Sequence, residues 1–164
     1  MGSHKQLQIA GTTLEYLFHE QVYWTLSLEE LVLVAEHTTN EGPYVDDYFL
    51  IFVTVQAQSL LFSSCSYYSE GRNSVLKHLA GKFGDPLEPG LRGAIAGVTE
   101  WNSRVIWPPP MAGKPYFTFT QAPPPDILEE VRGSAIGPAY ERTVAAEVRD
   151  YLTVQLAARA QPRR

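Results

Sequence analysis

Cysteine is almost absent from this chain of 164 residues, which contains Cys65 alone. A single cysteine cannot form an internal disulfide, and this cysteine content gives no indication of an oxidising compartment. Residues 1–11 also lack the apolar stretch of a signal peptide, and we interpret residues 1–5 as the remnant of an expression tag. We therefore expect a cytoplasmic protein.

Basic charge and long apolar segments are scarce as well. The chain carries 13 Lys and Arg against 18 Asp and Glu, a formal net charge of −5, which disfavours binding to nucleic acid or to anionic lipid. The longest apolar run, residues 48–55, ends at Gln56 and is far shorter than the ~20 residues that a membrane span needs. We expect neither nucleic acid nor a membrane among the partners.

The sequence also lacks the motifs that usually accompany catalysis, cofactors or metals. No G-x-S-x-G elbow, Walker sequence or dinucleotide-binding fingerprint occurs, although residues 84–97 are rich in glycine. His19, His37 and His78 are scattered without metal-ligand spacing, and the acidic residues of the loop at 38–47 do not match a calcium-binding loop. We therefore predict no cofactor and no metal.

Residues 46–67 are the segment around which the chain is organised. β-Branched and aromatic residues dominate 48–55, a normal strand length, and a second apolar run follows at 59–65. In an extended strand Ile51 and Val53 share one face while Leu50 and Phe52 share the other, so both faces are apolar. The pattern predicts a β-hairpin with one strand central in a sheet that is covered on both sides.

The remaining elements are predicted from periodicity and turn residues. Strands are expected at 6–9, 13–18, 22–26, 31–36, 103–107 and 114–120, the last two as a pair joined through 108–113. A short helical turn is expected at 27–30, where Ser27 and Glu30 have capping-box spacing, although one longer helix over 27–37 fits the same residues. Further helices are expected at 73–83, 127–132 and 139–158, with a short one near 90–96.

This order of elements predicts the α+β class. We expect a mainly antiparallel sheet that begins with an N-terminal meander and is covered by a mid-chain helix and a long C-terminal helix. The regular alternation of strands and helices that is typical of a doubly wound parallel sheet does not occur. The length fits a single domain over residues 1–164, ending in a basic tail at 160–164 that we expect to fray.

Residues 100–117 have the most unusual composition in the chain. They combine three consecutive prolines with five side chains of the types enriched in recognition surfaces: Trp101, Arg104, Trp107, Met111 and Tyr116. Large aromatic side chains are more often buried, so a competing interpretation places both tryptophans in the core. We predict a small soluble non-enzymatic protein that binds a protein partner or itself through this segment. An acidic inhibitor of a toxin would be a special case.

A second hypothesis places the function in a pocket between the sheet and the C-terminal helix. Its lining would include Tyr23, Tyr48, Cys65, Tyr67 and His78, either for binding a small molecule or for cysteine-dependent hydrolysis. A cysteine nucleophile needs an imidazole within hydrogen-bond reach, whereas a cysteine late in an apolar strand is more often a small buried hydrophobe. The structural interpretation of Cys65 is therefore favoured.

Overall fold

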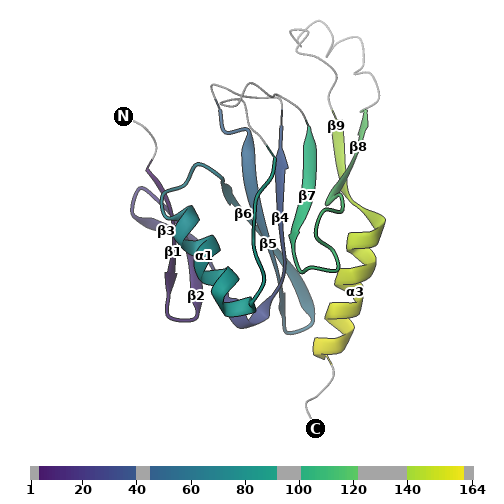
Figure 1. Ribbon diagram of the computed structural model, residues 1–164, viewed down its shortest axis with the longest axis horizontal. Helices are drawn as coiled ribbons and strands as arrows, with labels where there is room; N and C mark the ends of the chain where they lie inside the picture. Colours follow the sequence, from purple (N-terminus) through teal and green to yellow (C-terminus); the bar gives the residue numbers. More distant parts are fainter. Residues whose placement is uncertain (1–3, 40–44, 92–100, 122–139, 161–164) are drawn as a thin grey trace, which may run out of the picture.

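Strand β5, Tyr48–Gln56, lies inside a four-stranded antiparallel sheet in the computed structural model, which describes residues 4–39, 45–91, 101–121 and 140–160 (Figure 1). The strand order is β6-β5-β4-β7, with β4 at Leu31–Thr38, β6 at Ser59–Ser66 and β7 at Asn102–Trp107. The predicted hairpin is confirmed, because β5 and β6 pair along their whole length. Ala57 enters its turn with a φ of 54°, which costs roughly 1 kcal/mol for a residue with a Cβ. Burial of the strands, rather than a favourable turn sequence, therefore sets the register.

The N-terminal meander forms a separate three-stranded sheet in the order β1-β2-β3. Its strands are β1 (Lys5–Ala10), β2 (Thr13–Phe18) and β3 (Gln21–Ser27), all antiparallel as predicted. Both residues between β2 and β3, His19 and Glu20, have positive φ, as a type I′ hairpin requires. Lys5 forms an ion pair with Asp46, so the sheet includes the last residue of the segment interpreted as a tag remnant.

A single turn of 3-10 helix, η1 at Leu28–Glu30, joins β3 to β4. This confirms the short helical turn and excludes the longer helix over 27–37, since β4 begins at Leu31. Ser27 makes no side-chain capping hydrogen bond, so the capping-box spacing marks the turn without forming the cap. Every residue of β4 is buried, and burial on both faces favours extended chain for such an apolar run.

Helix α1, Arg72–Phe83, covers one face of the four-stranded sheet and confirms the helix predicted at 73–83. Its buried stripe consists of Val75, Leu76 and Leu79. These residues share one core with Leu50 and Phe52 of β5 and with residues of the meander. Gly84 ends the helix with a φ of 70°, the left-handed conformation that glycine adopts without strain.

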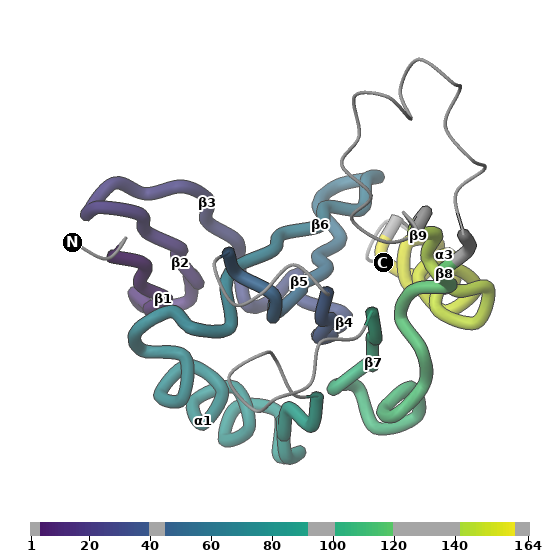
Figure 2. The backbone as a smooth tube through the Cα atoms, turned by 90° about the horizontal axis from the view of Figure 1, so that it is seen from above, coloured from purple at the N-terminus to yellow at the C-terminus, as the bar shows by residue number. Residues whose placement is uncertain are grey.

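Helix α3, Ala146–Ala160, covers the opposite face of the sheet. Its residues Val148 and Leu152 join Ile51 and Val53 of β5 in a second core. Figure 2 shows the meander at one side of the four-stranded sheet and α3 at the other. Both faces of β5 are therefore covered, as the sequence predicted.

The C-terminal helix begins later than predicted. The sequence pattern indicated a helix over 139–158, but Tyr140–Val144 forms strand β9, which pairs antiparallel with β8 at Phe117–Gln121. The helix prediction was therefore wrong at 140–144. Thr143 and Val144 are β-branched and fit a strand, and pairing with a strand that is distant in the sequence overrides the local helical periodicity.

The predicted pairing of the strands at 103–107 and 114–120 is also wrong. Strand β7 pairs with β4, with Glu36 opposite Arg104, whereas β8 pairs with β9. The chain does return along β7, because Val105 exchanges backbone hydrogen bonds with 113 and 114 at 2.9 and 2.8 Å. Pro115 has no N–H to extend this ladder, and β8 then pairs elsewhere.

The fold class is confirmed as α+β, with mainly antiparallel sheet, an N-terminal meander, a mid-chain helix and a C-terminal helix. None of the helices in the described parts of the chain is long and apolar enough to span a membrane. The helix predicted at 127–132, most of the one near 90–96 and the tail after residue 160 lie outside the described residues.

Candidate functional site

The aromatic segment predicted as a binding surface is divided between the two faces of the sheet. Met111 and Tyr116 are buried in the core under α3, at 7% and 1% exposure. Trp107 lies on the α1 face, where its ring stacks on Phe83 with the centroids 4.2 Å apart and its indole N–H donates to Asp85. The five predicted residues therefore do not form one continuous surface.

Arg104 lies on the α1 face as well, in a cluster that we call the Glu36 latch. Glu36 is fully buried and accepts the backbone N–H groups of Gly90, at 2.8 Å, and of Leu91. The Nε of Arg104 lies 3.7 Å from a Glu36 carboxylate oxygen, and its Nη2 donates to the Glu88 carbonyl at 2.7 Å. Burial raises the pKa of Glu36, and the two N–H donors and Arg104 oppose that rise. The latch holds the segment at 88–91 against β4 and β7.

The residues of the second predicted site are dispersed too. Tyr23 is 74% exposed on β3 and His78 is exposed on α1, whereas Cys65 is buried in the core beneath α1. Burial raises the pKa of the Cys65 thiol to about 12, so the nucleophilic thiolate is hardly populated near neutral pH. His37 lies on the opposite face of the sheet. The arrangement that a cysteine hydrolase needs is therefore not formed by these residues.

Tyr48 and Tyr67 do lie together, on the α1 face. Their rings stack with the centroids 3.8 Å apart, and the Arg72 guanidinium lies 3.8 Å from the centre of the Tyr67 ring. The Tyr48 hydroxyl is buried beside the Glu36 carboxylate. Burial, together with the nearby charge of Glu36, raises the pKa of Tyr48. This phenol therefore stays protonated, and the pair serves as packing beside the Glu36 latch.

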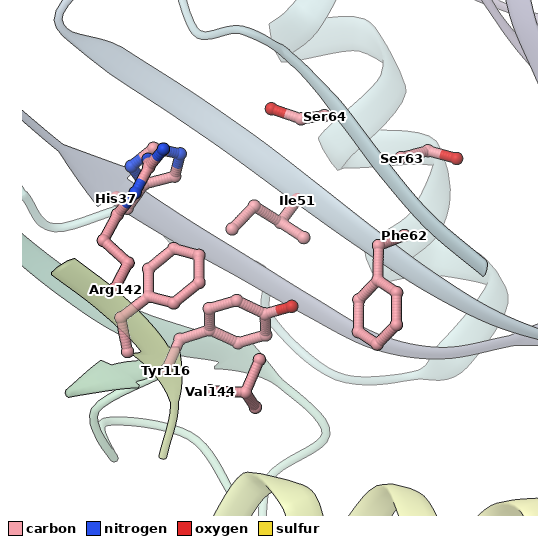
Figure 3. Close-up of a pocket in the computed structure, with 9 residues that line it drawn as sticks. His37, Ile51, Phe62, Ser63, Ser64, Tyr116, Arg142 and Val144 are labelled. Atoms are coloured by element: carbon pink, nitrogen blue, oxygen red, sulfur yellow. The ribbon is translucent and has the colours of Figure 1, made fainter. Parts of the chain in front are cut away.

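A cavity of about 430 Å³ opens on the other face of the sheet, between β5 and β6 on one side and β8 and β9 on the other (Figure 3). It is lined by His37, Ile51, Phe62, Ser63, Ser64, Tyr116, Phe117, Arg142 and Val144. The lining is mostly apolar, and Phe62 at its rim is 53% exposed. The cavity lies on the face of the sheet that the C-terminal helix covers, but its far wall is formed by β9 and not by the helix. Of the residues predicted for binding, Tyr116 alone lines it.

Arg142 and His37 both line the cavity, and the charge of Arg142 acts on the His37 ring (Figure 3). The guanidinium carbon of Arg142 lies 5.6 Å from the ring centres of both Trp101 and Phe117, within the range of a cation–π contact. The His37 ring stacks on Phe49 and meets Phe117 edge to face. Burial, and secondarily the charge of Arg142, lowers the pKa of His37 to about 4. His37 is therefore neutral at pH 7, and Arg142 is the full positive charge in the lining.

Hydroxyl groups provide the remaining polarity of the cavity. The Tyr116 hydroxyl points across it toward Phe62 (Figure 3), and burial raises the pKa of Tyr116, so this group is a neutral hydrogen-bond donor. Tyr116 is held in place by the buried Ser103, whose Oγ accepts the backbone N–H groups of Tyr116 and Phe117 at 3.2 and 2.8 Å. Adjacent residues of a strand point to opposite faces, so Ser64, which pairs with Ile51, presents its hydroxyl on the cavity side.

Chemically, the cavity suits non-covalent recognition. A guanidinium, a neutral imidazole and hydroxyl groups surround an apolar floor, which is the usual composition of a ligand site. Within the described residues there is no group of three or more His, Cys, Asp or Glu side chains that would hold a metal ion. Comparison of the chain with known protein families, with curated proteins and with solved structures finds no match. The interpretation of the site therefore depends on its geometry.

Sequence reasoning missed the cavity because it missed the strand that closes it. Arg142 falls within the helix predicted at 139–158, and its place in the same cavity as His37 depends on the pairing of β8 with β9. One signal was available in the sequence: Glu36 and His37 follow an apolar run that fills a buried strand. Buried polar side chains require hydrogen-bond partners. Because adjacent strand residues point to opposite faces, two such residues in succession indicate polar partners on both faces of the sheet.

Proposed function

We propose that this protein acts by non-covalent binding of a protein partner through the surface around the cavity mouth. The observation that carries the proposal is Arg142, which lies beside the rings of Trp101 and Phe117 at one end of an open apolar cavity whose rim carries the exposed Phe62. Arginine and aromatic side chains contribute most of the binding energy in typical protein interfaces. Of the segment first predicted, Trp101 and Tyr116 stay in the proposed site.

Composition and charge limit the location of the protein and the class of its partner. We place the activity in the cytoplasm, because a single cysteine gives no reason for an oxidising compartment. With a net charge of −5, we propose neither nucleic acid nor a membrane as the partner. In this proposal Met111 supports the surface from the core beneath α3, whereas Arg104 and Trp107 lie on the α1 face, away from it.

Affinity capture tests the proposal. The full chain is tagged and incubated with a lysate of its source cells, and the recovered proteins are compared between wild type, Arg142→Ala and Phe62→Ala. We expect both variants to lose at least tenfold in recovery of the specific partner. Leu61→Ala is the matched control, because Leu61 is 44% exposed but pairs with Thr54 and points to the other face. Unchanged recovery by both folded variants would contradict the proposal, and sedimentation of the purified chain shows whether the partner is a second copy.

A small-molecule-binding protein is the second candidate function. The cavity volume of about 430 Å³ lies within the range of roughly 300–1,000 Å³ for ligand pockets. The hydrolytic form of this candidate loses its basis, because Cys65 lies on the other face, in the core beneath α1. Ligand-induced thermal stabilisation without any recovered protein partner would favour this candidate over the first.

A further inference from the structure

We infer that the cavity recognises a carboxylate group carried on an apolar or aromatic stem, with Arg142 binding the carboxylate and the walls around Ile51 and Phe117 covering the stem. This deepens the proposed function, since it assigns a ligand chemistry to the same surface. The partner would present the group as an acidic side chain beside an aromatic one, and a free aryl carboxylic acid would present the same chemistry.

Charge is the first reason for an anion. Arg142 is the charged residue of the lining, and it forms no ion pair with any residue that the structure describes. A guanidinium offers five N–H donors in a planar fork that matches a carboxylate. An ammonium ligand would meet the Arg142 charge at close range, so amines are disfavoured. The overall charge of −5 makes this local positive end stand out from the rest of the molecule.

The number of charges favours a carboxylate over a phosphate. His37, Tyr116 and Ser64 contribute neutral polar groups to the lining, so one positive charge faces the ligand. A carboxylate carries one negative charge at neutral pH, which Arg142 balances. A phosphate monoester carries about two, and its second charge would remain uncompensated beside apolar walls, which is unfavourable.

The apolar walls define the rest of the ligand. Ile51, Phe117 and Val144 form most of the floor, and Phe62 extends it at the rim. A cavity of roughly 150 Å³ already accepts benzene, so about 430 Å³ has room for an aromatic ring and its carboxylate. The Tyr116 hydroxyl, which points across the cavity (Figure 3), is placed to donate a hydrogen bond to a polar substituent of the stem.

A titration with small probes tests this inference on the full chain. Phenylacetate and its uncharged isostere phenylacetamide are added separately to the ¹⁵N-labelled protein, and amide shifts are followed by NMR. We expect phenylacetate to bind with a dissociation constant on the order of 1–10 mM and the amide at least tenfold more weakly, with shifts confined to β4, β5, β6, β8 and β9. Arg142→Gln should remove the difference between acid and amide, and Arg149→Gln, on the exposed face of α3, should leave it unchanged.

Additional ligands, and comparison with the capture experiment, distinguish the possible results. Equal binding of acid and amide, or tighter binding of phenyl phosphate, would overturn the inference. The peptide N-acetyl-Phe-Asp-amide distinguishes the sources: tighter binding than phenylacetate supports an acidic partner segment, and weaker binding supports a free acid. If phenylacetate does not bind while Arg142→Ala still abolishes partner capture, the inference fails and the proposed function stands. If phenylacetate binds and Arg142→Ala leaves partner capture unchanged, the inference stands and the proposed function fails.

Discussion

Glu36 and His37 are neighbours in β4, yet their side chains lie on opposite faces of the four-stranded sheet. Glu36 accepts the backbone N–H groups of Gly90 and Leu91 on the α1 face, and His37 lines the cavity on the α3 face. Both side chains are buried, at 0% and 5% exposure. One buried strand therefore positions a structural latch and a candidate binding site, and substitutions at the two residues are expected to have different consequences.

Glu36→Ala should destabilise the fold by about 3 kcal/mol, because it leaves two backbone N–H groups without their acceptor and removes the carboxylate that lies 3.7 Å from the Arg104 Nε. Glu36→Gln retains one acceptor oxygen, so its loss should be smaller. Urea unfolding followed by circular dichroism measures both. Free energies of unfolding within 0.5 kcal/mol of wild type for Glu36→Ala, on the order of a neutral surface substitution, would show that the latch contributes nothing.

Gly90→Ala and Gly81→Ala should change stability in opposite directions. A Cβ on residue 90 would lie 2.6 Å from the Nη2 of Arg104, so the guanidinium would have to move and lose its hydrogen bond to Glu88, at a cost of about 1 kcal/mol. Gly81 lies in α1 with open space around its Cβ position, and alanine there should stabilise the protein by about 0.5–1 kcal/mol. Thermal unfolding of the two variants checks the signs, and a shift of both in one direction would contradict the expectation.

His37 should make the protein less stable in acid. Its pKa is about 4 in the fold and near 6.5 in the unfolded chain, so between these values the unfolded state binds more protons and stability falls as the pH falls. The full contribution of neutral His37 to the free energy of unfolding is present above pH ~6.5, and up to about 3 kcal/mol of it is lost by pH ~4. Other groups titrate in this range, so the measurement is the difference between wild type and His37→Gln. Parallel stability profiles for the two proteins from pH 7 to 4 would refute the expectation.

The Cys65 thiol should be unreactive toward thiol reagents in the folded protein. It is 2% exposed and its pKa is raised to about 12, so a thiol reagent such as Ellman's reagent should react at least a hundredfold more slowly than with the unfolded chain. Cys65→Ala should cost about 1 kcal/mol through lost packing and leave ligand titrations unchanged. Rapid labelling of the native protein would indicate an accessible thiolate and reopen the nucleophile hypothesis.

Local pattern was sufficient for the parts of the fold that depend on neighbours in sequence. The continuous apolar run around Ile51 and Phe52 predicted a strand covered on both sides, and the stripe of α1 with Gly84 after it predicted a helix and its end. In these segments the periodicity, the turn residues and the final burial all favour the same structure. The predicted binding residues were of types that form both interfaces and cores, so composition could not show that Trp107 lies on the α1 face and Tyr116 in the core beneath α3.

The sequence by itself determined the α+β class, the central hairpin and the two helices that cover it, because each follows from the spacing of apolar residues along one segment. Only the tertiary structure decided that residues 140–144 are a strand and that Arg142 lines the same cavity as His37, since both depend on pairing between β8 and β9. Strand pairing across a long separation is selected by packing and hydrogen bonding of the whole sheet, which local propensity does not encode. The candidate site is a product of that pairing.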